Sequence, residues 1–377
     1  MKKYSSTSNI QYISFEDELI VQSNVTDIAS FLDVNSLENK ATLIEKTFTR
    51  VGKQVNESKA EHIFLDIHLS YFKQSRFVPP FFLAAWNEIV RRIDDPNVQV
   101  KVITLVDDAF VIWQNLKKRE RDRYPGTSLR LREIISWRSV EMLLAESLAK
   151  NLTTESKGVK NYLVAVRHPP EAFFNLIFSP NPVCAYLSFP ITKTRDNPDH
   201  VKEITQFREC MHNLFINDNA VLFDPVTIDE LALRKATNNL KDSDNVVLEE
   251  NMRWPIKKNS LLPDIDWPIV IRREEVDEVL PDITNNIRER DFKLIDNSIF
   301  TIVYKPFLGG PSEGVRAEMD YAMQQGKGVY VLNPDFREQK NHPFSSTSTI
   351  FKSIEELSKH IKKVICDNKR RRSQFLG

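Results

Sequence analysis

The sequence predicts an α/β protein of two domains, each built on a mostly parallel sheet with helices on both faces. Three observations support this class. Short apolar runs typical of buried strands alternate with longer amphipathic stretches typical of helices. The chain has 377 residues, more than the roughly 250 at which a single core stops growing. Two prolines, Pro180 and Pro182, interrupt the alternation near mid-chain.

The first domain is predicted to cover residues 1–178. Its expected strands are short apolar runs bounded by polar residues: 61–67, 100–106 and 161–166. The expected helices lie between them, at about 80–93, 109–123 and 130–150. Because parallel strands require crossover connections, this alternation predicts a parallel sheet covered by helices.

The second domain is predicted to cover residues 183–377 and to be doubly wound, in the manner of Rossmann-like and flavodoxin-like folds. Its expected strands are residues 183–189, 220–223, 299–304 and 328–332. Its expected helices are residues 199–215, about 284–296, 312–325 and 353–366. The order of these segments again alternates strand with helix, as parallel sheets require.

One long insertion interrupts the second domain at about residues 225–281, where charges, Trp254, Trp267 and five prolines break any clean period. Loops without secondary structure rarely exceed about 12–15 residues, so an insertion of this length is expected to have a role. A lid or partner contact is one interpretation. A structured hairpin that covers the sheet is the other, and the sequence leaves both open.

The composition argues against a strongly charged nucleic-acid binder, because 52 basic residues balance 52 acidic ones. Three scattered cysteines show no disulfide framework and no zinc spacing, which indicates a cytoplasmic protein without a metal site. No apolar run is long enough to cross a membrane, so we expect no membrane partner. The basic residues 369–372 are expected beyond the last helix, as a solvated end or as a contact for nucleic acid or a partner.

The glycines gather in one segment, residues 309–334 (GGPSEGVRAEMDYAMQQGKGVYVLNP), which holds five of the nine glycines in the chain. Val315, Met319 and Ala322 follow helical spacing, and Gly326 is suited to the left-handed position that ends a helix. Ser312 is suited to cap the helix start. The segment therefore predicts a strand, a glycine turn and a helix.

The start of this helix is a candidate anion site. Free backbone N–H groups and the helix dipole favour a negative charge there, and Gly309, Gly310 and Gly314 allow a ligand close to the backbone. Glu318 follows Ser312 by six residues, about 9 Å along the helix axis. A plain strand–helix crossover with an ordinary surface glutamate explains the same spacing, and the usual phosphate-loop and dinucleotide patterns are absent.

Three segments in order give the second domain its resemblance to a known family. They are residues 186–191 (YLSFPI), residues 290–294 (RDFKL) and residues 311–318 (PSEGVRAE). With these segments the chain resembles the 2′-deoxynucleoside 5′-monophosphate N-glycosidases and their relatives, the nucleoside 2-deoxyribosyltransferases. The last segment is the most specific, and the resemblance covers the second domain only.

The resemblance implies a role for each matched residue. Glu318 is expected to be the nucleophile that attacks C1′ of the sugar, Asp291 to protonate or hold the departing base, and Tyr186 to orient Glu318. The residues expected to bind substrate, including its 5′-phosphate, are Ser312, Gly314, Gly310, Ile191 and Arg195. The resemblance implies no cofactor, and it implies a homo-oligomer, since relatives complete their pockets across a subunit interface.

The match has departures. The family has a small glycine-containing turn with an arginine after the first strand, whereas this chain has Phe189 and Pro190 there, with Arg195 further on. The phosphate contact is therefore less firmly predicted than the glutamate. The insertion at residues 225–281 has no counterpart in the family, which leaves the size and identity of the substrate open.

The first domain ends a predicted strand with Asp107 and Asp108, an arrangement that holds Mg²⁺ in nucleotide kinases. Together with residues 131–141, this resembles a nucleoside monophosphate kinase core only weakly. Gly52-Lys53 is followed by Gln54 and makes no phosphate loop. A kinase-like domain without kinase activity, used for assembly or sensing, and an unrelated α/β domain both remain open.

Two classes of function follow. The first is an enzyme that cleaves the N-glycosidic bond of a nucleotide through a covalent glycosyl-Glu318 intermediate, by hydrolysis or by transfer to an acceptor. The second is a catalytically silent nucleotide sensor. A glycosidase regulated by the first domain, as in a defence or toxin effector, would combine the two.

Overall fold

The computed structural model describes residues 9–34, 36–73, 76–78, 98–123, 129–153, 158–239, 243–256, 262–335 and 348–374. The chain divides into two compact units. The first comprises Met1–Thr104 with Glu133–Asn161, and the second comprises Leu105–Arg132 with Tyr162–Gly377. The predicted domain boundary at residues 178–183 lies within the second unit. Each unit is described by itself.

The second unit is built on a five-stranded sheet in the order β13-β12-β11-β7-β8. All four neighbouring pairs are parallel. The strands are β7 (Cys184–Ser188), β8 (Val221–Phe223), β11 (Phe300–Tyr304), β12 (Gly328–Leu332) and β13 (Thr349–Phe351). Ranked along the chain, the order is 5-4-3-1-2, which is the flavodoxin-like arrangement. The predicted doubly wound parallel fold is confirmed.

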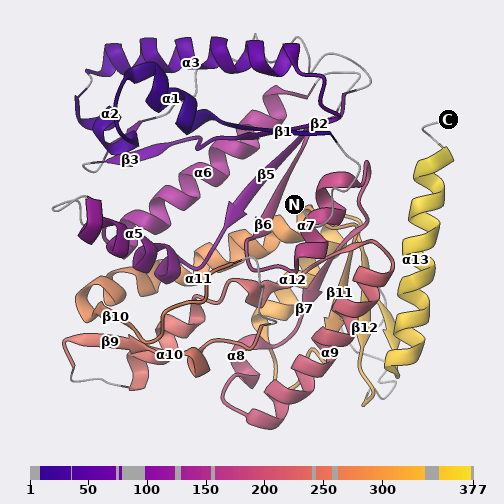
Figure 1. Cartoon of the computed structure of the whole chain (residues 1–377). Helices are drawn as coiled ribbons and strands as arrows, with labels where there is room; N and C mark the ends of the chain where they lie inside the picture. The colour runs from indigo at the N-terminus through magenta and orange to yellow at the C-terminus, as the bar shows by residue number, and fades with distance from the viewer. Residues whose placement is uncertain are drawn as a thin grey trace. The chain divides into compact units, whose positions relative to one another are not determined.

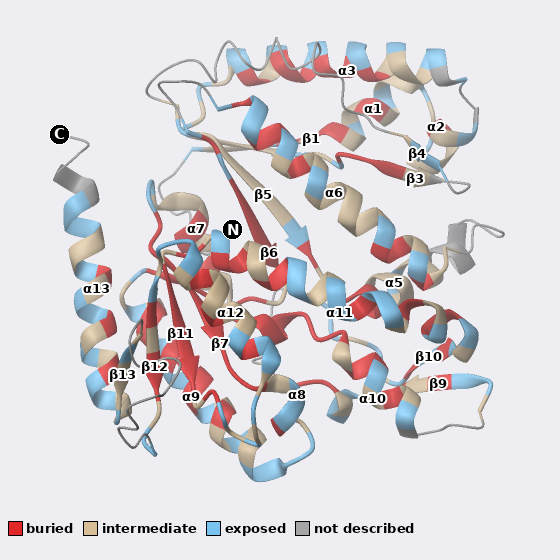
Figure 2. Ribbon diagram, turned by 180° about the vertical axis from the view of Figure 1, so that it is seen from behind, coloured by how far each residue is buried: buried red, intermediate tan, exposed pale blue. Residues whose placement is uncertain are grey.

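Helices cover both faces of this sheet (Figure 1). On one face lie α9 (Pro198–Asn217) and α13 (Ile354–Gln374), and on the other lie α11 (Arg273–Asp296) and α12 (Glu313–Gln324). The central strands β7 and β11 are buried on both faces and appear red in Figure 2. Continuous apolar runs form such strands because neither face meets water.

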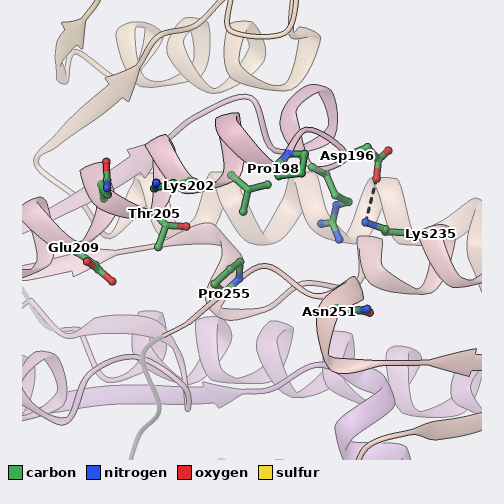
Figure 3. Close-up of a pocket in the computed structure, with 11 residues that line it drawn as sticks. Asp196, Pro198, Lys202, Thr205, Glu209, Lys235, Asn251 and Pro255 are labelled. Atoms are coloured by element: carbon green, nitrogen blue, oxygen red, sulfur yellow. Dashed lines mark ion pairs between the residues drawn. The ribbon is translucent and has the colours of Figure 1, made fainter.

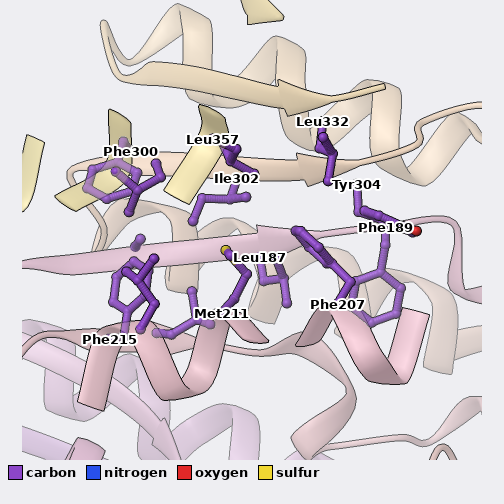
Figure 4. Close-up of a cluster of buried hydrophobic side chains, with 14 of the residues drawn as sticks. Leu187, Phe189, Phe207, Met211, Phe215, Phe300, Ile302, Tyr304, Leu332 and Leu357 are labelled. Atoms are coloured by element: carbon purple, nitrogen blue, oxygen red, sulfur yellow. The ribbon is translucent and has the colours of Figure 1, made fainter. Parts of the chain in front are cut away.

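The core on the α9 face shows how the strands alternate. Leu187 of β7 and Ile302 of β11 point toward Phe207 and Met211 of α9 (Figure 4). Successive side chains of a strand point to opposite faces, so Tyr186 and Ser188 of β7 face α11 and α12. This alternation decides which polar groups meet on the second face.

The predicted insertion is structured rather than a free lid in its described parts. It contains α10 (Leu231–Asn239) and the antiparallel pair β9 (Asn245–Leu248) and β10 (Ile269–Arg272). Two 3-10 turns, η2 (Pro225–Thr227) and η3 (Glu250–Met252), complete it. Trp254 belongs to the buried core of the sheet. The described parts fit the interpretation of a structured segment that covers the sheet, and a partner contact stays a prediction.

Shorter elements complete the second unit. Before the sheet come α5 (Ala109–Arg123) and α7 (Pro170–Phe178), and α8 (Ile191–Thr194) follows β7. The strands β5 (Lys101–Val106) and β6 (Lys160–Ala165) form a two-stranded sheet, and each contributes residues to both units.

The first unit has helices on two sides of a parallel strand pair. The pair is β1 (Ile10–Ser14) and β2 (His62–Asp66). Figures 1 and 2 place α1 and α3 on one side and α6 on the other. The helices are α1 (Phe15–Ser23), α2 (Ile28–Val34), α3 (Leu37–Glu57) and α6 (Leu131–Asn151), and a short antiparallel pair joins β3 (Tyr71–Lys73) to β4 (Arg76–Val78). Phe15, Phe48 and Leu148 belong to one buried core.

Most predicted elements are confirmed to within a few residues, but two helix boundaries were wrong. The helix α11 begins at Arg273 rather than near residue 284, because Pro281 is accommodated inside it. The helix α13 continues to Gln374, so the basic residues 369–372 belong to its last turns. Positive charge is favourable there because it opposes the negative end of the helix dipole. The predicted helix at 80–93 lies outside the described residues.

No membrane-crossing segment is found among the described helices, since none combines the required length with a sufficiently apolar sequence.

The turn between β11 and α12 explains part of the glycine cluster. Gly309 has φ +73°, and a Cβ at this position would lie 2.7 Å from the backbone oxygen of Lys193 in α8. Gly326 has φ +68° and ends α12, where the amides of Gly326 and Lys327 bond to Met323 and Ala322. Both positions need a left-handed backbone, but only Gly309 also needs the missing side chain.

Replacing these two glycines separates the two requirements. Gly326→Ala is expected to lower the free energy of unfolding by roughly 1–2 kcal/mol, the cost of a left-handed alanine. Gly309→Ala is expected to cost about 1–3 kcal/mol more, because its Cβ collides with fixed backbone. Urea denaturation of both variants measures the difference. Equal losses would show that the turn does not pack against Lys193 in this way.

Candidate active site

The carboxyl group of Glu318 lies against the end of β7. Glu318 is the sixth residue of α12, and the hydroxyl of Ser188, the last residue of β7, donates a hydrogen bond to its Oε2 atom. The residue keeps part of its surface exposed, but protein encloses the carboxyl group itself. Ser188 is fully buried, so the sheet fixes this contact.

Tyr186 lies two residues before Ser188 on the same face of β7 and is fully buried. Its hydroxyl is near Glu318, although the geometry falls short of a formed hydrogen bond to any described residue. Burial, followed by the charges of Asp291 and Glu318, raises the pKa of Tyr186 well above its ordinary value. The hydroxyl therefore stays protonated beside the carboxylate.

Asp291 is placed on the same face by α11 and is held by its neighbour in the chain. Arg290 donates from Nε at 3.1 Å and from Nη2 at 2.9 Å, both to the Oδ1 atom of Asp291. Asp291 is 4% exposed and Arg290 is 5% exposed. Because the guanidinium uses one carboxylate oxygen, Oδ2 receives no hydrogen bond from a described residue.

The two carboxyl groups influence each other. Burial, followed by the charge of Asp291, raises the pKa of Glu318 to about 8, against the opposing effects of Ser188, Tyr186 and Arg290. Burial also raises the pKa of Asp291, against the opposing effect of Arg290. Two close carboxyl groups resist double ionisation. The pair therefore holds a proton more readily than two separate carboxyl groups would.

A third acidic residue contributes to this charge balance. Glu230, 1% exposed, accepts a hydrogen bond from the Ala109 amide at 3.2 Å. Its charge raises the pKa of both Arg290 and Asp291. Glu230 comes from the insertion, so that segment takes part in the electrostatics of the carboxyl pair.

The start of α12 has the form predicted for an anion site. The hydroxyl of Ser312 accepts a hydrogen bond from the Val315 amide at 3.4 Å, which caps the helix as expected. Gly310 has φ +111° with open space around it. A Cβ on Gly314 would approach only Ser312, at an ordinary 3.9 Å. The fold does not require glycine at 314, and the glycine leaves the helix start accessible.

The other two predicted binding residues follow β7. Ile191 begins α8 and is half-buried against the core. Arg195 donates to Asp229 and, at 2.9 Å, to the carbonyl oxygen of Met252. These contacts direct Arg195 toward the insertion rather than toward Glu318, so its phosphate contact stays a prediction.

Two adjoining grooves lie on the second unit, and Arg195 and Lys235 line both. Their volumes are about 520 Å³ and about 980 Å³. Figure 3 shows the smaller groove, in which Lys235 forms an ion pair with Asp196 at 3.1 Å. Neither groove is lined by Glu318 or Asp291, so neither belongs to the candidate active site.

Asp107 and Asp108, which follow β5, each form an ion pair with an arginine. Asp107 accepts from Arg167 at 2.9 Å, and Asp108 accepts from Arg253 at 2.7 Å. Burial raises the pKa of Asp108 to about 6, against the attraction of Arg253. Within the described ranges, no group of three metal-binding side chains comes together. The geometry does not support the Mg²⁺ arrangement, and Gly52-Lys53 lies inside α3.

The structure brings Glu318, Asp291 and Tyr186 together and adds three residues that the sequence analysis missed. Ser188 was part of the quoted first segment, and its spacing of two from Tyr186 placed both on one strand face. Arg290 preceded Asp291 in the second segment. Glu230 carried no signal, because the insertion had no recognisable period.

No family model matches this chain, and no curated protein matches it.

Glu318→Gln is expected to become more stable than the parent protein as pH rises. The folded pKa of Glu318 is raised from 4.5 to about 8. Its protonated form therefore contributes stability below pH 4.5, which is lost as pH rises through about 8. Each pKa unit corresponds to about 1.4 kcal/mol, and about three units separate pH 5 from the folded pKa of about 8, so we expect a relative gain on the order of 4 kcal/mol between pH 5 and pH 9.

Urea denaturation of both proteins at the two pH values measures this gain. Glu313→Gln is the control, because Glu313 is exposed in the first turn of the same helix. Its stability difference from the parent protein should change by less than about 0.5 kcal/mol over the same range. A Glu318→Gln difference that is flat with pH would mean that the carboxyl group is not buried beside Asp291.

Proposed function

We propose that the second unit cleaves the N-glycosidic bond of a nucleotide, a 2′-deoxynucleoside 5′-monophosphate being the expected substrate. One observation carries the proposal: the enclosed carboxyl group of Glu318 lies against Ser188 at the carboxyl end of β7, with the buried carboxyl group of Asp291 on the same face of the sheet. In doubly wound sheets this is the position at which ligands bind. Glycosidases use two carboxyl groups in this way, one as nucleophile and one as acid.

The reaction needs no external reactant other than water. A carboxylate oxygen of Glu318 bonds to C1′ as the C1′–N bond breaks, and the electron pair of that bond leaves with the base. A proton from Asp291 passes to the base, which departs neutral. Water then attacks C1′, releases Glu318 and returns a proton to Asp291. An acceptor base in place of water would give transfer instead of hydrolysis.

The remaining predicted residues fit this scheme as substrate contacts. The backbone at Gly310 and Gly314 and the capped start of α12 would receive the 5′-phosphate, since helix N-termini favour anions. Ser188 and Tyr186 would hold the Glu318 carboxylate toward C1′. A homo-oligomer that completes the pocket is proposed on the resemblance alone.

A catalytically silent nucleotide sensor is the second candidate. It is favoured by the observation that the two grooves of the second unit lie apart from Glu318, as a binding module that does not use this carboxylate would require. The buried, mutually destabilising carboxyl groups weigh against it, because a binding site gains nothing from their cost.

Activity is tested by incubating the protein with each of the four 2′-deoxynucleoside 5′-monophosphates and detecting free base by chromatography. Glu318→Gln is expected to lower base release by roughly 10³-fold or more, because the nucleophile is lost. Glu356→Gln, which changes an exposed glutamate of α13, serves as the control and should retain the parent rate. Base release by Glu318→Gln at the parent rate would exclude the proposed nucleophile.

The pH dependence of kcat/KM reports the shared proton. The working pair holds one proton, so kcat/KM is expected to fall as pH rises above about 8, where that proton is lost. Asp291→Asn is expected to lower the rate about 10²–10⁴-fold because the acid is removed. In Asp291→Asn, kcat/KM should no longer fall above about pH 8. This variant has no acid to lose, so the remaining reaction requires only that Glu318 is ionised.

Rates measured from pH 5 to pH 10 on both proteins test this. An alkaline decline that persists unchanged in Asp291→Asn would assign the proton to another group.

A further inference from the structure

We infer that Arg290 is a further catalytic residue, whose Nη1 group donates a hydrogen bond to the acceptor atom of the departing base beside its glycosidic nitrogen. This inference rests on the proposed function. The acceptor is N3 in purines and O2 in pyrimidines. The hydrogen bond would stabilise the electron pair that the base takes from C1′.

The first observation is an unused donor. The guanidinium of Arg290 carries five N–H groups, and its Nε and Nη2 atoms serve Asp291. Its Nη1 atom is buried and finds no acceptor among the described residues. An unpaired buried donor costs about 1–3 kcal/mol, and more when it is charged. A lysine would neutralise Asp291 equally well, so the unused arm of the arginine needs another explanation.

The second observation is the place of the guanidinium. It is bound to Asp291, and its charge acts on Tyr186 and Glu318, so it lies near both of these groups. Two more buried hydroxyls without a described partner, Tyr186 and Thr301, are register neighbours on β7 and β11. Unpartnered polar groups therefore gather on the face that carries Glu318.

The charges select the kind of acceptor. Asp291, Glu230 and Glu318 surround Arg290, so a phosphate with two negative charges would be repelled at this point. A base acceptor is neutral in the substrate and becomes negative only as the C1′–N bond breaks. A donor that is fixed in advance and aimed at developing charge stabilises the transition state more than the substrate.

Asp291 and Arg290 would then act on the same base as two adjacent donors. The proton of Asp291 neutralises the base, and the Nη1 group of Arg290 bonds to the neighbouring acceptor without losing a proton. The two hydrogen bonds to Oδ1 hold the guanidinium beside the carboxyl group of Asp291.

The test changes the ligand atom and the residue separately. The substrate is whichever of the four 2′-deoxynucleoside 5′-monophosphates the protein cleaves fastest. It is compared with an analogue that lacks the strong acceptor. For a purine this is the 3-deaza form, in which N3 becomes C–H, and for a pyrimidine it is the 2-thio form, in which sulfur replaces O2. The parent protein is expected to prefer the natural substrate by roughly 10–100-fold in kcat/KM, the value of a hydrogen bond to a charged group.

The preference should shrink to a few-fold in Arg290→Gln and in Arg290→Lys. The ratio of two substrates measured on one preparation does not depend on how much of the variant is folded. It therefore separates a role at the base from a purely structural ion pair, which would lower both rates equally. Arg290→Lys keeps a charge beside Asp291 and is the safer variant for folding. Arg288→Gln, on the exposed part of the same helix, is the control and should keep the parent preference.

The outcomes separate this inference from the proposed function. Base release with an unchanged preference in both Arg290 variants overturns the inference and leaves the function intact. If no nucleotide releases base, the proposed function fails. Calorimetry then compares the binding of 2′-deoxyadenosine 5′-monophosphate and of its 3-deaza form to the parent protein, the two Arg290 variants and Arg288→Gln. A loss of discrimination confined to the Arg290 variants would still support the contact, whereas equal binding, or none, by the parent protein would overturn it.

Discussion

The buried contact between Arg290 and Asp291 is the constraint on which the candidate site of the second unit depends. Without the guanidinium, two carboxyl groups and Glu230 would lie together in a region closed to water, where unpaired charges are costly. With it, one of the buried negative charges is balanced by the guanidinium. Burial then raises the pKa of Glu318 to about 8. A protein maintains such a cost where a reactive carboxyl group is useful.

The topology of the sheet decides where this cluster forms. The order β13-β12-β11-β7-β8 makes β7 and β11 neighbours, although more than a hundred residues separate them in the chain. Their connections leave toward opposite faces, so Ser188 and Tyr186 meet α11 and α12 on one face while α9 packs on the other. The turn at Gly309 packs closely against Lys193 and sets the start of α12.

The insertion at residues 225–281 contacts the sheet core and the charged groups near the candidate site. Asp229 pairs with Arg195, Arg253 pairs with Asp108, and Trp254 joins the sheet core. Glu230, next to Asp229, acts on Arg290 and Asp291. A segment that looked irregular in sequence therefore balances the charges beneath the candidate site. The insertion is held by contacts between residues far apart in the chain, and such contacts produce no helical or strand period in the sequence.

The sequence by itself determined the alternation of strands and helices, the glycine turn and the cap at Ser312, which follow from apolar runs, helical spacing and short motifs. The resemblance to a known family, rather than any local pattern, grouped Tyr186, Asp291 and Glu318 as candidates. Tertiary structure decided that α11 tolerates Pro281, that Arg195 pairs with Asp229, and that Arg290 and Glu230 join the carboxyl pair. The physical reason is that a buried charge takes its partner from whatever the fold brings near. That choice depends on distance in space and on exclusion of water, neither of which a single sequence displays.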